Sequence, residues 1–154
     1  MLDEPQILQT SARLTAFIPV VVPRERIREV MGPGLEELKA AVAAQGIEVT
    51  GPWFTHHVRL DPDVFDFEIS LPVASPVTAS GRVQPGEWPA MTVARTVYHG
   101  GYEGLGAAWE EFDDRVGAHD HVLMPDLREV YLVGPWENED PAAWQTELSR
   151  EIVR

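Results

Sequence analysis

Cysteine is absent from this chain of 154 residues. Without thiols the protein forms no disulfide bond, uses no thiolate nucleophile and has no cysteine-ligated zinc site. Long hydrophobic segments are lacking too, because the longest apolar run, Phe17 to Val22, is interrupted by Pro19 and ended by Pro23. A bilayer span needs roughly 20 apolar residues, so we expect no membrane segment. The N-terminus also lacks the features of a signal peptide, and we expect a soluble, cytoplasmic protein.

Basic residues are scarce and scattered along the chain. There are 12 lysines and arginines against 25 acidic residues, which gives a net charge of −13. A field of this sign repels a phosphate backbone, so direct nucleic-acid binding is not expected. The same field attracts cations, although acidity could equally serve only to keep the protein in solution.

Motifs for nucleotide, phosphate and metal binding are missing as well. The sequence has no glycine-rich phosphate loop, no dinucleotide fingerprint and no Gly-x-Ser-x-Gly elbow. His119 and His121 form a His-x-His pair in a loop, but no cluster of carboxylates accompanies them in the sequence. We therefore predict neither a cofactor nor a metal site.

The order of the predicted elements indicates an α+β fold. With 44% hydrophobic residues, a chain of this length can bury one core. In the first half we predict a strand over 7–18, a short and a longer helical piece within 27–46 separated at Gly32-Pro33-Gly34, and strands over 53–60 and 64–71. This order is βαββ.

The second half repeats the order, with a strand over 91–98, a helical stripe from Tyr102 to Val116, and strands over 129–133 and 144–152. Short matches support a duplication at two offsets. At an offset of 79, Glu68-Ile69-Ser70 matches Glu147-Leu148-Ser149 and Leu14–Ile18 falls on Val93–Val97. At an offset of 74, the helical residues Leu35, Leu38 and Val42 match Trp109, Phe112 and Val116.

We interpret residues 1–154 as a single domain with repeats at about 7–73 and 89–153, joined by a linker over 74–88. Two βαββ units with antiparallel sheets would bury their apolar faces by joining about a pseudo-twofold axis. The groove on that axis is the expected ligand pocket.

Several motifs, taken in order, resemble the GyrI-like small-molecule-binding domain. They are His99-Gly100-Gly101-Tyr102-Glu103-Gly104-Leu105, Trp109, Glu129-Val130-Tyr131 and Thr146-Glu147-Leu148. The family includes the effector-binding domains of BmrR and AraC-type regulators and also stand-alone proteins. The resemblance implies an aromatic cleft with a central acidic residue, Glu129, that meets lipophilic cations. The chain carries no attached DNA-binding segment, so a transcription-factor role is not expected.

Strand alternation places Glu129 and Tyr131 on the same face of their strand. A buried carboxylate needs a partner, which a cationic ligand could supply. The alternatives for Glu129 are a surface position or an ion pair with Arg128 or Arg95. Tyr131 is either a groove residue or a core aromatic with its hydroxyl at the rim.

Aromatic residues are further candidate contacts, because each ring face attracts an organic cation by about 0.5 to 2 kcal/mol. Tyr102 and Trp109 share one helix face and are either core or groove residues. Trp88 and Trp144 are predicted to pack structurally. The remaining assigned ligand contacts are Trp53, Trp136, Phe17 and His57, the last as the member of the His56-His57 pair that faces the groove.

Three functions are compatible with these observations. The first is binding of a small lipophilic, cationic compound for sensing, sequestration or detoxification. The second, which the family resemblance adds, is hydrolysis of cyclopropane-bearing genotoxins, with Glu129 as base and Tyr102 or Tyr131 as the hydroxyl partner. The third is interaction with a protein partner, as in family members that protect DNA gyrase. The ligand and the oligomeric state stay open.

Overall fold

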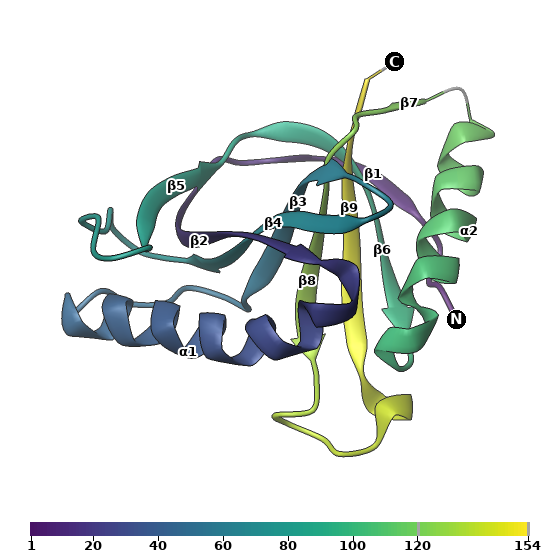
Figure 1. The fold of residues 1–154 in the computed structure, drawn as a ribbon. Helices are drawn as coiled ribbons and strands as arrows, with labels where there is room; N and C mark the ends of the chain where they lie inside the picture. Colours follow the sequence, from purple (N-terminus) through teal and green to yellow (C-terminus); the bar gives the residue numbers. More distant parts are fainter. Residues whose placement is uncertain (120, 154) are drawn as a thin grey trace. The chain divides into compact units, whose positions relative to one another are not determined.

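The computed structural model describes residues 1–119 and 121–153 and has the expected α+β class (Figure 1). The chain divides into two compact units. We call them the N-terminal unit, Ser11–Ala90, and the C-terminal unit, Met1–Thr10 with Met91–Arg154. Each unit is an antiparallel sheet with an α-helix packed on one face. In the described part of the chain, no helix combines the length and the apolar character that a membrane crossing requires.

The sheet of the N-terminal unit has the strand order β3-β4-β2-β5. Its elements are β2 (Arg13–Pro23), the 3-10 helix η1 (Arg24–Arg26), α1 (Ile27–Ala44), β3 (Phe54–Leu60), β4 (Val64–Pro72) and β5 (Gln84–Trp88). The helix buries one apolar stripe, Leu35, Leu38 and Val42, as its spacing predicts. This stripe packs on alternate residues of β2 and β4, namely Ala16, Ile18, Val20, Phe67, Ile69 and Leu71.

Helix α1 is continuous, whereas the sequence predicted two pieces separated at Gly32-Pro33-Gly34. Pro33 lies inside the helix, where its lack of an N–H group removes one backbone hydrogen bond. Gly34 permits a close approach to the sheet, because a Cβ atom there would lie 2.5 Å from Cδ1 of Ile69. Burial of the apolar stripe thus outweighs the local tendency to break.

The sheet of the C-terminal unit has the strand order β1-β6-β9-β8, and β7 pairs with β9. Its elements are β1 (Gln6–Thr10), β6 (Met91–His99), η2 (Tyr102–Gly104), α2 (Leu105–Gly117), β7 (Val122–Leu123), β8 (Leu127–Val133), η3 (Pro141–Ala143) and β9 (Gln145–Val153). As predicted, α2 buries Trp109, Phe112 and Val116. The core beneath them is formed by Ala94, Tyr98, Leu127, Leu148 and Ile152.

Two predicted segments differ from the structure. The strand expected over 7–18 is two strands, of which β1 pairs with β6 and β2 pairs with β4. The linker expected over 74–88 contains β5, whose Trp88 packs on Phe54 with 4.9 Å between ring centroids. Both differences depend on partners distant in sequence, which local periodicity does not reveal.

The two units share the order βαββ, with β4 and β9 as the middle strands. Ile69 and Leu148 are both 0% exposed and pack towards their helix, in agreement with the offset of 79. In the first strand the offset is 78, because Ile18 lies opposite Ile69 and Thr96 lies opposite Leu148. The predicted match of Ile18 with Val97 is therefore wrong. A slip of one residue puts Val97 on the face away from α2.

Candidate functional site

Glu129 lies on β8 and points to the side of the sheet that α2 covers. Opposite it in the ladder is Leu148 of β9, a core residue that packs against α2. Only 9% of Glu129 is exposed. The alternation of β8 puts Tyr131, which is 5% exposed, on the same face. The carboxylate is thus buried beside a phenol.

Two neutral side chains hold this carboxylate. The Tyr131 hydroxyl donates to Oε1 of Glu129 at 2.8 Å, and the Trp109 indole N–H donates to Oε2 at 2.7 Å. Trp109 also packs in the core of its unit, with its ring centroid 5.8 Å from that of Phe112. Because one donor comes from β8 and the other from α2, the orientation of the carboxylate is fixed by both elements.

Tyr102 and Trp144 extend the aromatic surface next to Glu129. The ring centroid of Tyr102 lies 6.0 Å from that of Tyr131, edge to face, and 4.8 Å from that of Trp144, tilted by 37°. Burial, and secondarily the negative charge of Glu129, raises the pKa of the Tyr102 hydroxyl to about 12. This phenol therefore stays protonated at neutral pH.

A glycine-rich turn positions Tyr102. Gly100 has a φ of 146°, a conformation that side chains rarely adopt. The Tyr98 hydroxyl donates to the carbonyl of Gly101 at 2.9 Å and sits against Gly104, leaving no room for a Cβ atom there. In the structure, Gly104 accommodates the side chain of Tyr98.

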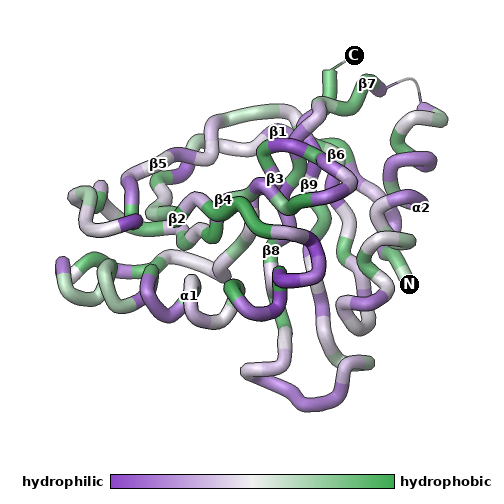
Figure 2. Tube along the Cα trace, viewed as in Figure 1, coloured by the Kyte–Doolittle hydropathy of each residue, from purple (hydrophilic) through white to green (hydrophobic). Residues whose placement is uncertain are grey.

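Trp144 was expected only to pack structurally, and the structure gives it a place in this aromatic cluster. It ends the hydrophilic segment between β8 and β9 (purple in Figure 2). Its indole N–H donates to the carbonyl of Asn138 at 2.8 Å, and its own carbonyl accepts from the backbone N–H of Gly100 at 3.1 Å. Antiparallel pairing of β6 with β9 brings the start of β9 to the turn that carries Tyr102. The pairing of these two strands was therefore the signal that could have placed Trp144 beside Tyr102.

The sequence model of the GyrI-like small molecule binding domain matches residues 4–149. The chain belongs to this family. Among curated proteins no sequence matches significantly. The comparison with solved structures instead finds several similar folds.

Three structures show the similarity of fold. The crystal structure of the EcmrR C-terminal domain has a TM-score of 0.84 at 22% identity and covers 98% of this chain and 98% of that one. A hydrolase from Listeria innocua has a TM-score of 0.69 at 11% identity and covers 97% and 92%. SAV2435 bound to tetraphenylphosphonium has a TM-score of 0.65 at 8% identity and covers 98% and 94%. The chain spans 57% of the EcmrR chain in an EcmrR–DNA complex.

Of the other residues predicted to contact a ligand, Phe17, Trp53 and His57 belong to the N-terminal unit, and Trp136 belongs to the C-terminal unit. His57 on β3 stacks on Phe67, with 5.3 Å between ring centroids, on the α1 side of the sheet. Trp53 packs partly buried against the same core. Phe17 lies one residue from the core residue Ile18 and therefore faces the opposite side. Trp136, half exposed in the segment after β8, donates to Oε1 of Glu137 at 2.9 Å.

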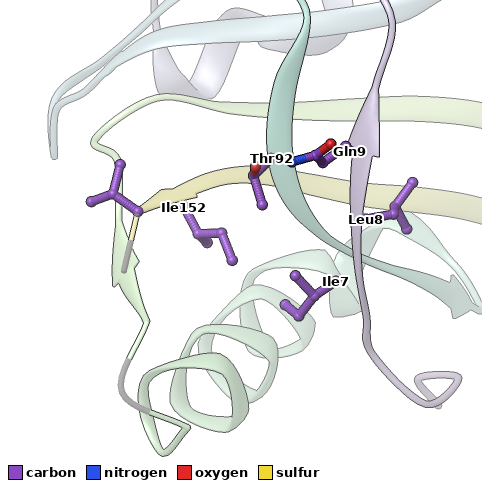
Figure 3. A pocket seen from close by; sticks show the side chains of 6 residues that line it. Ile7, Leu8, Gln9, Thr92 and Ile152 are labelled. Atoms are coloured by element: carbon purple, nitrogen blue, oxygen red, sulfur yellow. The ribbon is translucent and has the colours of Figure 1, made fainter.

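A separate hollow of about 600 Å³ lies in the C-terminal unit. It is lined by Ile7, Leu8, Gln9, Thr92, Ile152 and Val153, of which Figure 3 shows Ile7 from β1 and Ile152 from β9. These side chains carry no charge. Along β9, Ile152 is roughly 13 Å from Leu148, the ladder partner of Glu129. The lining of the hollow includes neither Glu129 nor the aromatic residues around it.

Proposed function

We propose that this GyrI-like domain binds a lipophilic organic cation, with Glu129 as the counter-ion. The rings of Tyr102, Tyr131, Trp109 and Trp144 supply the apolar contacts. The proposal rests on the buried carboxylate, which two neutral donors hold at 2.7 and 2.8 Å. Trp109 and Tyr131 orient the carboxylate and carry no positive charge themselves. Such binding would serve sensing, sequestration or detoxification of the compound.

Burial of Glu129 makes its charge favour cationic ligands over neutral ones. A carboxylate removed from water attracts a cation more strongly than an exposed one, because the effective dielectric constant around it is lower. Each ring face adds about 0.5 to 2 kcal/mol for a cation. A neutral molecule of the same shape gains only the apolar contact. The net charge of −13 adds a general attraction for cations.

A relative of the same fold supports this ligand class. SAV2435 has been solved with tetraphenylphosphonium, which is a lipophilic cation. EcmrR has been solved in a complex with DNA, but this chain spans only 57% of that one. DNA binding is therefore not part of the function that we propose for this chain.

The test compares a cation with a neutral molecule on two proteins. Calorimetry would measure the affinities of tetraphenylphosphonium and of triphenylphosphine oxide for the wild-type protein and for Glu129→Gln. We expect Glu129→Gln to weaken binding of the cation by about 1 to 3 kcal/mol and to leave the affinity for the neutral compound nearly unchanged. Equal losses for both compounds would remove Glu129 from the binding site.

Hydrolysis is a second candidate, favoured by a protonated phenol near a carboxylate. Glu129 would take a proton from water, and the water oxygen would bond to an electrophilic ring carbon as a cyclopropane C–C bond breaks. Tyr102 would protonate the released carbon and regain its proton from Glu129. The net reaction adds one water molecule. The Listeria innocua structure of the same fold is described as a hydrolase.

Mass spectrometry after incubation with excess of a cyclopropane-bearing alkylating agent distinguishes the two functions. A hydrolase forms the hydrated product over many turnovers, and Glu129→Gln should slow it by about 10²- to 10⁴-fold. A binding protein returns the compound unchanged.

A further inference from the structure

Tyr102 differs from the other two tyrosines in the use of its hydroxyl. Tyr98 donates to the carbonyl of Gly101 at 2.9 Å, and Tyr131 donates to Glu129 at 2.8 Å. The Tyr102 oxygen is enclosed, and within residues 1–119 and 121–153 no side-chain or backbone atom is its hydrogen-bond partner. Buried donors are almost always paired, so an enclosed hydroxyl of this kind needs an explanation.

Packing does not explain the hydroxyl. A phenylalanine at position 102 would keep the ring contacts with Tyr131 and Trp144, whose centroids lie 6.0 and 4.8 Å away. It would also avoid enclosing an unpaired polar group, which lowers stability. The hydroxyl therefore has no benefit inside the folded chain that the ring alone would not supply.

The chemistry of the hydroxyl defines the partner it needs. With a pKa of about 12, raised by burial and by the charge of Glu129, the phenol keeps its proton and is a donor throughout the neutral range. The missing partner is consequently an acceptor. An anionic acceptor is disfavoured, because Glu129 places a negative charge nearby. A neutral oxygen or nitrogen remains.

We propose that the Tyr102 hydroxyl donates a hydrogen bond to a neutral acceptor on the bound molecule, so that the preferred ligands are organic cations that also carry an ether or carbonyl oxygen. This inference rests on the proposed function and assigns to Tyr102 the choice among cations. Glu129 attracts the charge, and Tyr102 distinguishes an oxygen-bearing cation from a pure hydrocarbon cation. A site built to donate a hydrogen bond discriminates against ligands that leave the donor unpaired.

Trp144 helps to hold Tyr102 in place in the absence of a ligand. Its ring supports Tyr102, and its indole is fixed by the hydrogen bond to the carbonyl of Asn138 at 2.8 Å. The backbone N–H of Gly100, two residues before Tyr102, donates to the carbonyl of Trp144 at 3.1 Å. The ring of Tyr102 is therefore held in place before a ligand arrives, and the hydrogen bond requires little ordering of the side chain.

The probes that test this are pairs of phosphonium cations that differ by one oxygen. Methoxyphenyl(triphenyl)phosphonium and ethylphenyl(triphenyl)phosphonium have the same charge and nearly the same shape, and each is available as ortho, meta and para isomers. Calorimetry on the wild-type protein should show the methoxy compound binding about 3- to 10-fold tighter than its ethyl partner for at least one isomer. Tyr102→Phe should abolish this preference and bind the ethyl compound at least as well as the wild type does.

Tyr131→Phe is the matched control, because it removes a hydroxyl that is already paired within the site. It should weaken binding of the methoxy and ethyl compounds alike and keep the ratio of their affinities. The inference is overturned if no isomer pair favours the methoxy compound on the wild type, or if the preference survives in Tyr102→Phe. The proposed function then still stands, since the cations bind. If none of the phosphonium probes binds the wild type, the proposed function fails and this inference fails with it.

Discussion

His57 of β3 occupies the same ladder position as Tyr131 of β8, and a β-bulge directly follows each residue. Each side chain also bonds to the residue two positions earlier. Oγ1 of Thr55 lies 3.1 Å from Nε2 of His57, and Glu129 accepts from Tyr131 at 2.8 Å. The two units thus share a buried polar pair, which contains a carboxylate in the C-terminal unit only.

Removing the Thr55 hydroxyl should destabilise the N-terminal unit. Thr55 is 0% exposed, so Thr55→Val leaves a nitrogen of His57 without this bond inside the protein. We expect a loss of about 1 to 3 kcal/mol in the free energy of unfolding, measured by urea denaturation. The control is Thr50→Val at an exposed position, which should change it by less than about 0.5 kcal/mol. Equal midpoints for the two variants would contradict a stabilising Thr55–His57 bond.

Two tyrosine-to-phenylalanine substitutions should differ in their effect on stability. Tyr131→Phe removes a donor to a carboxylate and should lower the free energy of unfolding by about 1.5 to 3 kcal/mol. Tyr102→Phe removes an enclosed hydroxyl without a protein partner, so it should be neutral or stabilising. Denaturation of both variants beside the wild type measures this. A clear loss of stability in Tyr102→Phe would mean that the hydroxyl is paired within the folded chain.

Alkaline pH should destabilise the protein in part through Tyr102. Its pKa is raised to about 12 by burial and then by Glu129, whereas the phenol of the unfolded chain ionises near about 10. Below pH 10 the Tyr102 hydroxyl is protonated in both the folded and the unfolded chain, and its contribution to stability is complete. Between about pH 10 and 12 only the unfolded chain loses the proton, so stability falls as the pH rises. Denaturation over this range should show a smaller fall for Tyr102→Phe than for the wild type.

Of two glycines around the start of α2, one should tolerate a methyl group and the other should not. Gly104→Ala places Cβ against the Tyr98 hydroxyl and should lower the free energy of unfolding by about 1 to 3 kcal/mol. Gly106→Ala meets open space in α2 and should stabilise by about 0.5 to 1 kcal/mol. Combining Gly104→Ala with Tyr98→Phe should destabilise less than the sum of the two changes, because the clashing oxygen is gone.

Much of the fold could be predicted because it depends on local periodicity. The stripe of Leu35, Leu38 and Val42 follows the helical repeat, and strand alternation placed Glu129 and Tyr131 on one face. These patterns depend only on the backbone geometry of one element. They hold wherever that element is later packed.

The rest of the cluster around Glu129 depends on contacts between elements. The bond from Trp109 to Glu129 joins α2 to β8 and requires both the depth of the helix and the strand register. Trp144 reaches Tyr102 only through the pairing of β6 with β9. The misplaced register of Ile18 has the same origin, since a short match in sequence does not fix the face of a strand.

Strand β1 has a consequence for the order in which the protein folds during synthesis. Its partner β6 is distant in sequence, with Thr10 opposite Met91, a separation of 81 residues. The N-terminal unit is contiguous, Ser11–Ala90, and can close as soon as it leaves the ribosome. Strand β1 is made before the N-terminal unit but must wait for β6, which is made after that unit and pairs with β9 on its other edge. We therefore expect the sheet of the C-terminal unit to be completed only after the N-terminal unit has folded.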